Sequence, residues 1–189
     1  EGLHIPVFAM RMPIEEARGF SFSEGAPPLI VVNAADSVHA RIFTLFHEFA
    51  HLLLDTPGVC LPDEAGPDRA GLIVESFANH FAGSLLVPRD VLLKHEGVRS
   101  VAQSPTRFDQ KLDEIAADFK VSKQVIWRRM QLTGLISLGK YRERLNAWEK
   151  AKGKRPPKKQ YFGMSPAKRC LRERGALFTF LVLEAKAQG

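Results

Sequence analysis

The chain has 189 residues, 45% of them hydrophobic and 25% charged, which excludes a disordered protein and allows one good core with a smaller second unit. Its two distant cysteines, Cys60 and Cys170, exclude a disulfide framework, and no apolar run reaches the roughly 18 residues that suggest a membrane span; we expect a cytoplasmic protein. The net charge of +6 is unevenly divided, with 6 basic and 12 acidic residues in 1–95 (net −6) against 21 and 9 in 96–189 (net +12).

Short β-type runs open the chain. Residues 3–8, 20–22 and 29–32 are rich in apolar and aromatic side chains, and prolines and glycines separate them. Runs this short and closely spaced favour a small antiparallel sheet. An extended substrate could add to that sheet as a strand along residues 29–33.

Two apolar helices should follow the sheet. Apolar side chains recur at helical spacing over residues 38–54, until Pro57-Gly58, and again over residues 71–86, until Val87-Pro88. The first pattern is apolar on nearly every side, so we expect a buried helix there, and a second buried helix after the polar loop at 62–69. Strands followed by helices predict an α+β fold.

The first helix contains the segment that carries the chemistry, His47-Glu48-Phe49-Ala50-His51. At about 100° per residue, His47 and His51 lie one turn apart on nearly the same face, where both imidazoles can bind one metal ion. Glu48 points beside that ion, where a general base can take a proton from water. The alternative is a pair of core histidines with Glu48 at the surface. It is disfavoured because such groups are costly in an apolar helix unless they have a strong partner.

A catalytic zinc ion takes three protein ligands and keeps one position open. Glu75 interrupts the apolar face of the second helix, 24 residues after His51, where an antiparallel helix can return a carboxylate to the ion. Asp55, one turn after His51, is better interpreted as a polar residue at a helix end, and the third histidine of a metzincin is missing. We therefore predict zinc on His47, His51 and Glu75, with manganese as the alternative ion.

Together the two helices resemble a known family. The runs are FTLFHEFAHLLL and VESFANHFAGSLLVP, preceded by an apolar strand and an asparagine, Ile30 to Asn33. Over about residues 3–137 the chain resembles the ImmA/IrrE family of bacterial metallopeptidases. The resemblance implies a zincin-like domain of the gluzincin type, with His47, His51 and Glu75 on the metal and Glu48 as the base. It further implies cleavage of a helix-turn-helix transcriptional repressor, which induces a stress or mobile-element gene set.

Three more polar residues are candidates for supporting roles. Asn79, one turn after Glu75, could hydrogen-bond a metal ligand, and His80 and His95 could do the same or stabilise the oxyanion of the reaction. The plainer interpretation, ordinary surface or helix-end residues, is favoured for each of them. No oxyanion stabiliser is assigned.

The basic half of the chain, residues 96–189, contains a helix-turn-helix pattern. Residues 107–119 and 123–132 predict two amphipathic helices around a tight turn, with Ser122 as N-cap and Gly134 just past the end. Three polar side chains of the second helix would project toward nucleic acid or a protein partner: Lys123, Gln124 and Arg128. We rank a packing unit that supports the peptidase cleft slightly above DNA binding. Residues 138–150 predict a further helix.

The patterns divide the chain into three segments. We expect a zincin-like peptidase domain over 1–97, a helix-turn-helix-like unit over 98–150, and a basic linker with a C-terminal helical segment, ending incomplete, over 151–189.

Two functions other than a repressor-cleaving peptidase stay open. One is a non-catalytic antirepressor that uses the metal for folding, and the other is a DNA-binding regulator with a vestigial peptidase fold.

Overall fold

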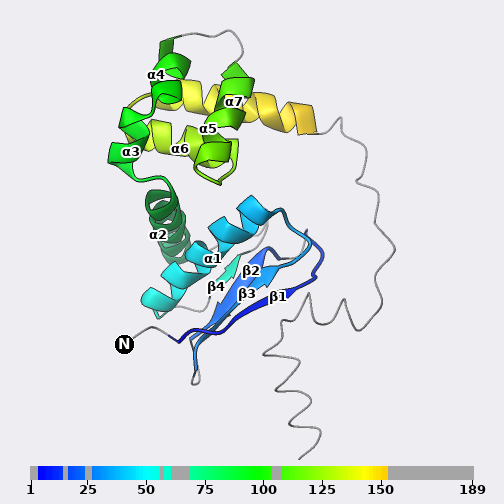
Figure 1. The fold of residues 1–189 in the computed structure, drawn as a ribbon. Coiled ribbons are helices and arrows are strands. Elements are labelled where there is room, and N and C mark those ends of the chain that lie inside the picture. Colours follow the sequence, from blue (N-terminus) through cyan, green and yellow to red (C-terminus); the bar gives the residue numbers. More distant parts are fainter. Residues whose placement is uncertain are drawn as a thin grey trace, which may run out of the picture. The chain divides into compact units, whose positions relative to one another are not determined.

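Figure 1 shows the computed structural model of the chain, which describes residues 4–14, 17–23, 27–55, 58–60, 69–103 and 108–152. The fold is α+β, as the sequence predicts. The chain divides into two compact units, the first running to Ala82 and the second beginning at Gly83. The domain bounds 1–97, 98–150 and 151–189 stay predictions. No helix in the described part of the chain is long and apolar enough to cross a bilayer.

The first unit is built on a four-stranded sheet. Its strands lie in the order β1-β3-β2-β4, with the bounds β1 (Val7–Met10), β2 (Gly19–Phe22), β3 (Leu29–Asn33) and β4 (Gly58–Cys60). The prediction of an antiparallel sheet is correct for β2, which pairs antiparallel with β3 and β4. It is wrong for β1, which runs parallel to β3. The sequence analysis missed β4, which is only three residues long.

The central place of β3 explains the parallel pair. Ile30, Val31 and Val32 are at most 7% exposed, so the most apolar strand takes a position where neighbours cover it. Because β1 and β2 run in opposite directions, a strand between them must be parallel to one. Both edges of β3 are paired, so the expectation that a substrate adds along residues 29–33 is wrong.

Asn33 ends β3 and fixes the loop between β1 and β2. Its side chain is fully buried. The amide Nδ2 donates to the carbonyl oxygens of Met12, at 2.9 Å, and Ala17, at 2.8 Å. Its Oδ1 accepts from the backbone nitrogens of Met12, at 3.2 Å, and Ala35, at 2.9 Å. The chain ahead of β2 is thereby held to the end of β3, which sets where β2 lies.

Helix α1 (Val38–Leu53) lies across one face of the sheet (Figure 1) and contacts β2, β3 and β4. Ser37 caps it, because its Oγ accepts from the backbone nitrogen of Ala40 at 3.2 Å. The expectation of a wholly buried helix is only partly right, since Leu53 is 55% exposed. The most buried side chains of α1 include its polar ones, and this is where the site lies.

Helix α2 (Arg69–Leu86) carries the second motif. Ala78 and Ala82 are fully buried, whereas Ile73 is 66% and Phe77 44% exposed. The prediction that the apolar side chains of α2 are all buried is therefore wrong for one side of the helix. The polar loop expected at 62–69 falls almost entirely outside the described residues.

The second unit contains five helices in its described part. They are α3 (Arg89–Lys94), α4 (Glu96–Gln103), α5 (Phe108–Asp118), α6 (Lys123–Leu132) and α7 (Leu138–Lys152). Only α5, α6 and α7 were predicted, since α3 and α4 are too short for a clear periodic pattern. From residue 153 onward, the expected linker and C-terminal segment lie outside the described residues.

The second unit has its own core. Its fully buried side chains come from every helix between α3 and α6, and they include Leu92, Val98, Leu112, Ile126 and Met130. Between α5 and α6 the chain turns through Lys120, which has a φ of 56°. Ser122 then caps α6, its Oγ accepting from the backbone nitrogen of Val125 at 3.3 Å. The predicted turn and cap are confirmed.

Candidate metal centre

One face of α1 carries four buried polar side chains. Thr44, His47, Glu48 and His51 are at most 3% exposed, and their spacing places them within about 100° of one another around the helix axis. This face is turned toward β2 and toward Glu75 of α2. A polar face buried this deeply needs partners for its groups. Besides the contact between His47 and His51, these partners are Glu75 of α2 and Ser21 of β2.

Three side chains, two from this face and one from α2, bring their ligand atoms together. The Nε2 atoms of His47 and His51 lie 3.2 Å apart. Glu75 Oε2 is 3.2 Å from His47 Nε2, and Glu75 Oε1 is 3.2 Å from His51 Nε2. Among the described residues, these three form the one group of this kind that lies close enough to hold a metal ion.

The donor set fits a divalent metal ion. Two ligand atoms of a tetrahedral zinc ion, each about 2.05 Å from the metal, lie about 3.3 Å apart. The three separations of 3.2 Å match that value closely. Two imidazole nitrogens with one carboxylate are ordinary zinc ligands, and they suit manganese as well. The geometry therefore supports a metal site without choosing the ion.

Hydrogen bonds and charge interactions between Glu75 and the two histidines stabilise this cluster in the absence of a metal ion. Hydrogen bonds from His47 and His51 lower the pKa of Glu75 to about 2. Burial alone would lower the pKa of His51, but the hydrogen bond to Glu75 and the charges of Glu48 and Glu75 outweigh it, so the pKa of His51 is raised. Glu75 is therefore ionised at every physiological pH, while His51 holds its proton more strongly than an ordinary histidine.

Metal affinity should fall as the pH is lowered through the range where His51 takes up a proton. The ion needs the neutral imidazole, and the raised pKa of His51 moves the competition to higher pH. We expect up to about a tenfold weaker affinity per pH unit once His51 is protonated. A competition titration with a chelator from about pH 8 to about pH 5.5 measures this. An affinity that stays constant over that range would contradict the assignment of His51.

Glu48 lies beside the three donors with its carboxyl group buried. Burial raises the pKa of Glu48, while the charges of His47 and His51 and a hydrogen bond from Ser21 partly offset this. Ser21 Oγ donates to Glu48 Oε2 at 2.9 Å. A carboxyl group whose charged form is disfavoured by burial accepts protons readily, which is what a general base requires.

Ser21 was missed by the sequence analysis. In the strand Gly19-Phe20-Ser21-Phe22, simple alternation would bury the phenylalanines and expose the serine. The structure does the reverse, since Ser21 is 2% exposed and Phe22 52%. The available signal was Gly19, because glycine within a strand often marks a close approach of another element.

The other candidate residues do not join the cluster. Asn79 and His80 are exposed, and no hydrogen bond between either of them and a ligand is seen in the described part of the chain. Their supporting roles stay predictions. In the second unit, His95 Nε2 pairs with Asp118 Oδ2 at 3.2 Å. Asp55 is exposed at the end of α1 with a φ of 50°, consistent with its interpretation as a helix-end residue.

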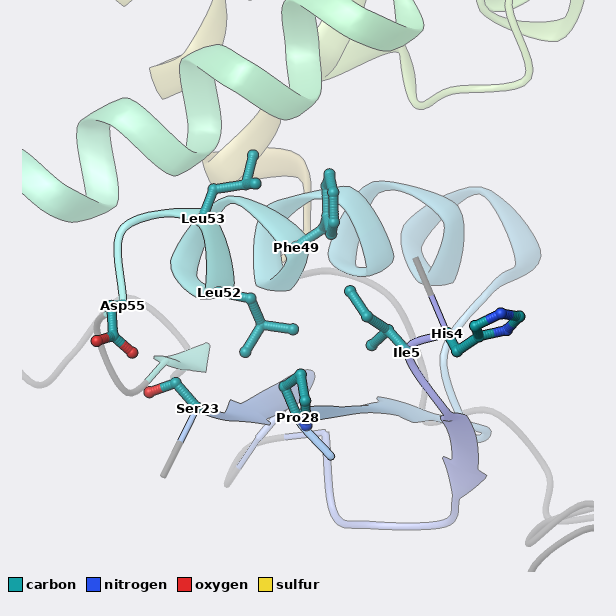
Figure 2. A pocket seen from close by; sticks show the side chains of 8 residues that line it. All are labelled: His4, Ile5, Ser23, Pro28, Phe49, Leu52, Leu53 and Asp55. Carbon is teal, nitrogen blue, oxygen red and sulfur yellow. The ribbon is translucent and has the colours of Figure 1, made fainter. Parts of the chain in front are cut away.

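An apolar pocket of about 420 Å³ lies on another side of α1 (Figure 2). Leu52, Phe49 and Leu53 line it from the helix, and Ile5 and Pro28 from the chain beside the sheet. Phe49 and Leu53 each follow a histidine of the His47, His51 and Glu75 cluster by two positions, which turns them about 200° away from it around the helix axis. The pocket therefore does not belong to the metal centre.

Comparison with known families agrees with this geometry. A family model described as the IrrE N-terminal-like domain of a peptidase family matches residues 1–131. That range includes strand β2 and helices α1 and α2, which build the centre. It also includes the four ionisable side chains of the centre, which are His47, Glu48, His51 and Glu75. Among curated proteins, none matches the chain. The family match covers well over half of the sequence, and the chain belongs to the IrrE N-terminal-like peptidase family.

Proposed function

We propose that the protein is a metal-dependent endopeptidase in which His47, His51 and Glu75 hold zinc and Glu48 is the general base. The observation that carries the proposal is the convergence of three donors at 3.2 Å beside a buried carboxyl group. A structural metal site would have four protein ligands, whereas three leave a position open for a reacting molecule.

A divalent ion bound there supplies Lewis-acid chemistry, lowering the pKa of water and polarising a carbonyl oxygen. Glu48 takes the proton of the attacking water on its carboxylate and later delivers it to the nitrogen of the leaving amine. His47 and His51 act as neutral ligands through Nε2. Glu75 contributes the negative charge, and its low pKa keeps that charge in place.

We propose a helix-turn-helix transcriptional repressor as the substrate, so that cleavage induces a stress or mobile-element gene set in the cytoplasm. The resemblance of both motif runs to the ImmA/IrrE family supports this. The test is to incubate the zinc-loaded full chain with the repressor encoded beside it and to follow the products by mass spectrometry. One or two defined cuts that a chelator prevents are expected. An intact repressor with either ion, zinc or manganese, would count against the substrate.

A role of the helix-turn-helix-like unit in packing, more than in reading DNA, is supported by the neighbours of α6. The Lys123 ammonium group lies 5.6 Å from the centre of the Trp148 ring, and the Arg128 guanidinium 5.2 Å from that of Tyr141. Lys123 Nζ also pairs with Asp113 Oδ2 at 3.3 Å. Two of the three side chains expected to project from α6 are thus engaged within the second unit. Gln124 is half-buried.

Duplex DNA should bind the full chain weakly and without sequence preference. A basic surface whose best-placed cations rest on aromatic rings can still attract phosphates, but it offers few contacts to base edges. Affinity should fall at least about tenfold between roughly 50 and roughly 200 mM salt. Fluorescence anisotropy with two unrelated duplexes measures both properties. A nanomolar, sequence-selective complex lost in the Lys123→Glu/Arg128→Glu variant would instead favour the DNA-binding regulator.

A further inference from the structure

Strand β2 meets α1 in two successive contacts. Gly19 and Ser21 are two residues apart and so lie on one face of the strand, and Thr44 and Glu48 are four apart on one face of the helix. A Cβ added at Gly19 would overlap the Cγ2 methyl group of Thr44 and lie 3.6 Å from Cγ of Glu48. The strand therefore comes closer to the helix than any side chain larger than glycine allows.

The close approach at Gly19 brings the next residue on the same face to the base. Ser21 Oγ donates to Glu48 Oε2 at 2.9 Å, in a hydrogen bond buried at both ends. Among the described residues, the second oxygen, Oε1, has no hydrogen-bond partner. One oxygen of the carboxyl group is held by the sheet, and the other is left available for a proton.

We infer that Ser21 is a positioning residue for the proposed peptidase reaction: its hydroxyl holds Oε2 of Glu48 and thereby directs Oε1 to the reacting water. The inference rests on the proposed role of Glu48. A glutamate has three rotatable side-chain bonds, and proton transfer depends on its carboxylate lying within hydrogen-bond reach of the water. Because Oε2 is fixed by a hydrogen bond, rotation about those three bonds is restricted, while Oε1 stays available to accept the proton.

The experiment compares Ser21→Ala with Ser23→Ala in the zinc-loaded full chain, with a pool of internally quenched peptides as the probe. Ser23 lies two residues after Ser21, one position past the end of β2. Its variant therefore removes a hydroxyl group close by in the chain but leaves the hydrogen bond from Ser21 to Glu48 in place. We expect kcat of Ser21→Ala to fall about tenfold while KM and zinc affinity stay unchanged. Ser23→Ala should keep the kcat of the unmodified chain, and Ser21→Thr, which restores a hydroxyl, should recover part of the loss.

A stability measurement tests the contact without relying on cleavage. If Ser21 and Glu48 are coupled, the change in Tm of the Ser21→Ala/Glu48→Ala double variant, in which each single substitution removes the hydrogen bond, should differ from the sum of the single changes by about 2–4 °C. Additive changes, or a Ser21→Ala variant with unchanged kcat, would overturn the inference. A coupled pair in a chain that cleaves no peptide would reject Glu48 as the base and leave Ser21 a structural partner only.

Discussion

Replacing Glu48 by glutamine is expected to lower the rate of peptide cleavage by about 10²- to 10⁴-fold, while the protein keeps its metal and its fold. The amide preserves the shape of the side chain and can still accept the hydrogen bond from Ser21, but it cannot take up a proton at neutral pH. The measurement is kcat with the zinc-loaded chain, alongside metal content and Tm.

Asp55→Asn is the matched control for this substitution. It also exchanges a carboxylate for an amide at the C-terminal end of α1, but Asp55 is exposed and outside the metal cluster. Its cleavage rate should equal that of the unmodified chain. If Glu48→Gln lost its metal and cleavage together, Glu48 would have to be a ligand, and the division of roles proposed for α1 would be wrong.

A protein that lacks either histidine ligand should lose its bound metal ion. His47→Ala or His51→Ala leaves two of three donors, and we expect at least about a 10²-fold weaker affinity, since even the loss of a residue that only supports a ligand costs about 10- to 100-fold. Glu75→Gln should weaken binding less, because the amide oxygen can still reach the ion while the negative charge is lost. Metal analysis after dialysis ranks the variants.

His39→Ala provides the matched control, since His39 belongs to the same helix, two turns before His47, and lies outside the donor cluster. It should retain about one divalent ion per chain. Full occupancy in His47→Ala or His51→Ala would contradict the site. Occupancy lost in all three variants would instead indicate that α1 itself had been destabilised.

The metal centre could be predicted because its signals are local or nearly so. His47 and His51 are one helical turn apart, a relation that the helix alone determines. Glu75 stood out as a carboxylate on an otherwise apolar helix face. The periodic patterns of α1, α2 and α6 also gave their bounds to within about two residues, which is the usual accuracy of helix ends.

The parts that could not be predicted depend on contacts between segments far apart in sequence. Whether β1 pairs parallel or antiparallel depends on which strand occupies the centre of the sheet, and no pattern within β1 contains that information. The burial of Ser21 depends on Glu48, 27 residues later. The exposure of Ile73 and Phe77 on α2 was missed because periodicity shows an apolar face without showing what covers it.

Asn33 makes the fold depend on a single amide group. An asparagine-to-aspartate substitution keeps the shape of the side chain but exchanges the amide nitrogen for an oxygen, which cannot donate when the carboxylate is ionised. Here that change would replace a donor by an oxygen opposite the carbonyl oxygens of Met12 and Ala17, now 2.9 and 2.8 Å from Nδ2. Two attractions would become two repulsions, and the loop that leads into β2 would be released. The site that Ser21 and Glu48 share thus depends on a residue that touches neither of them.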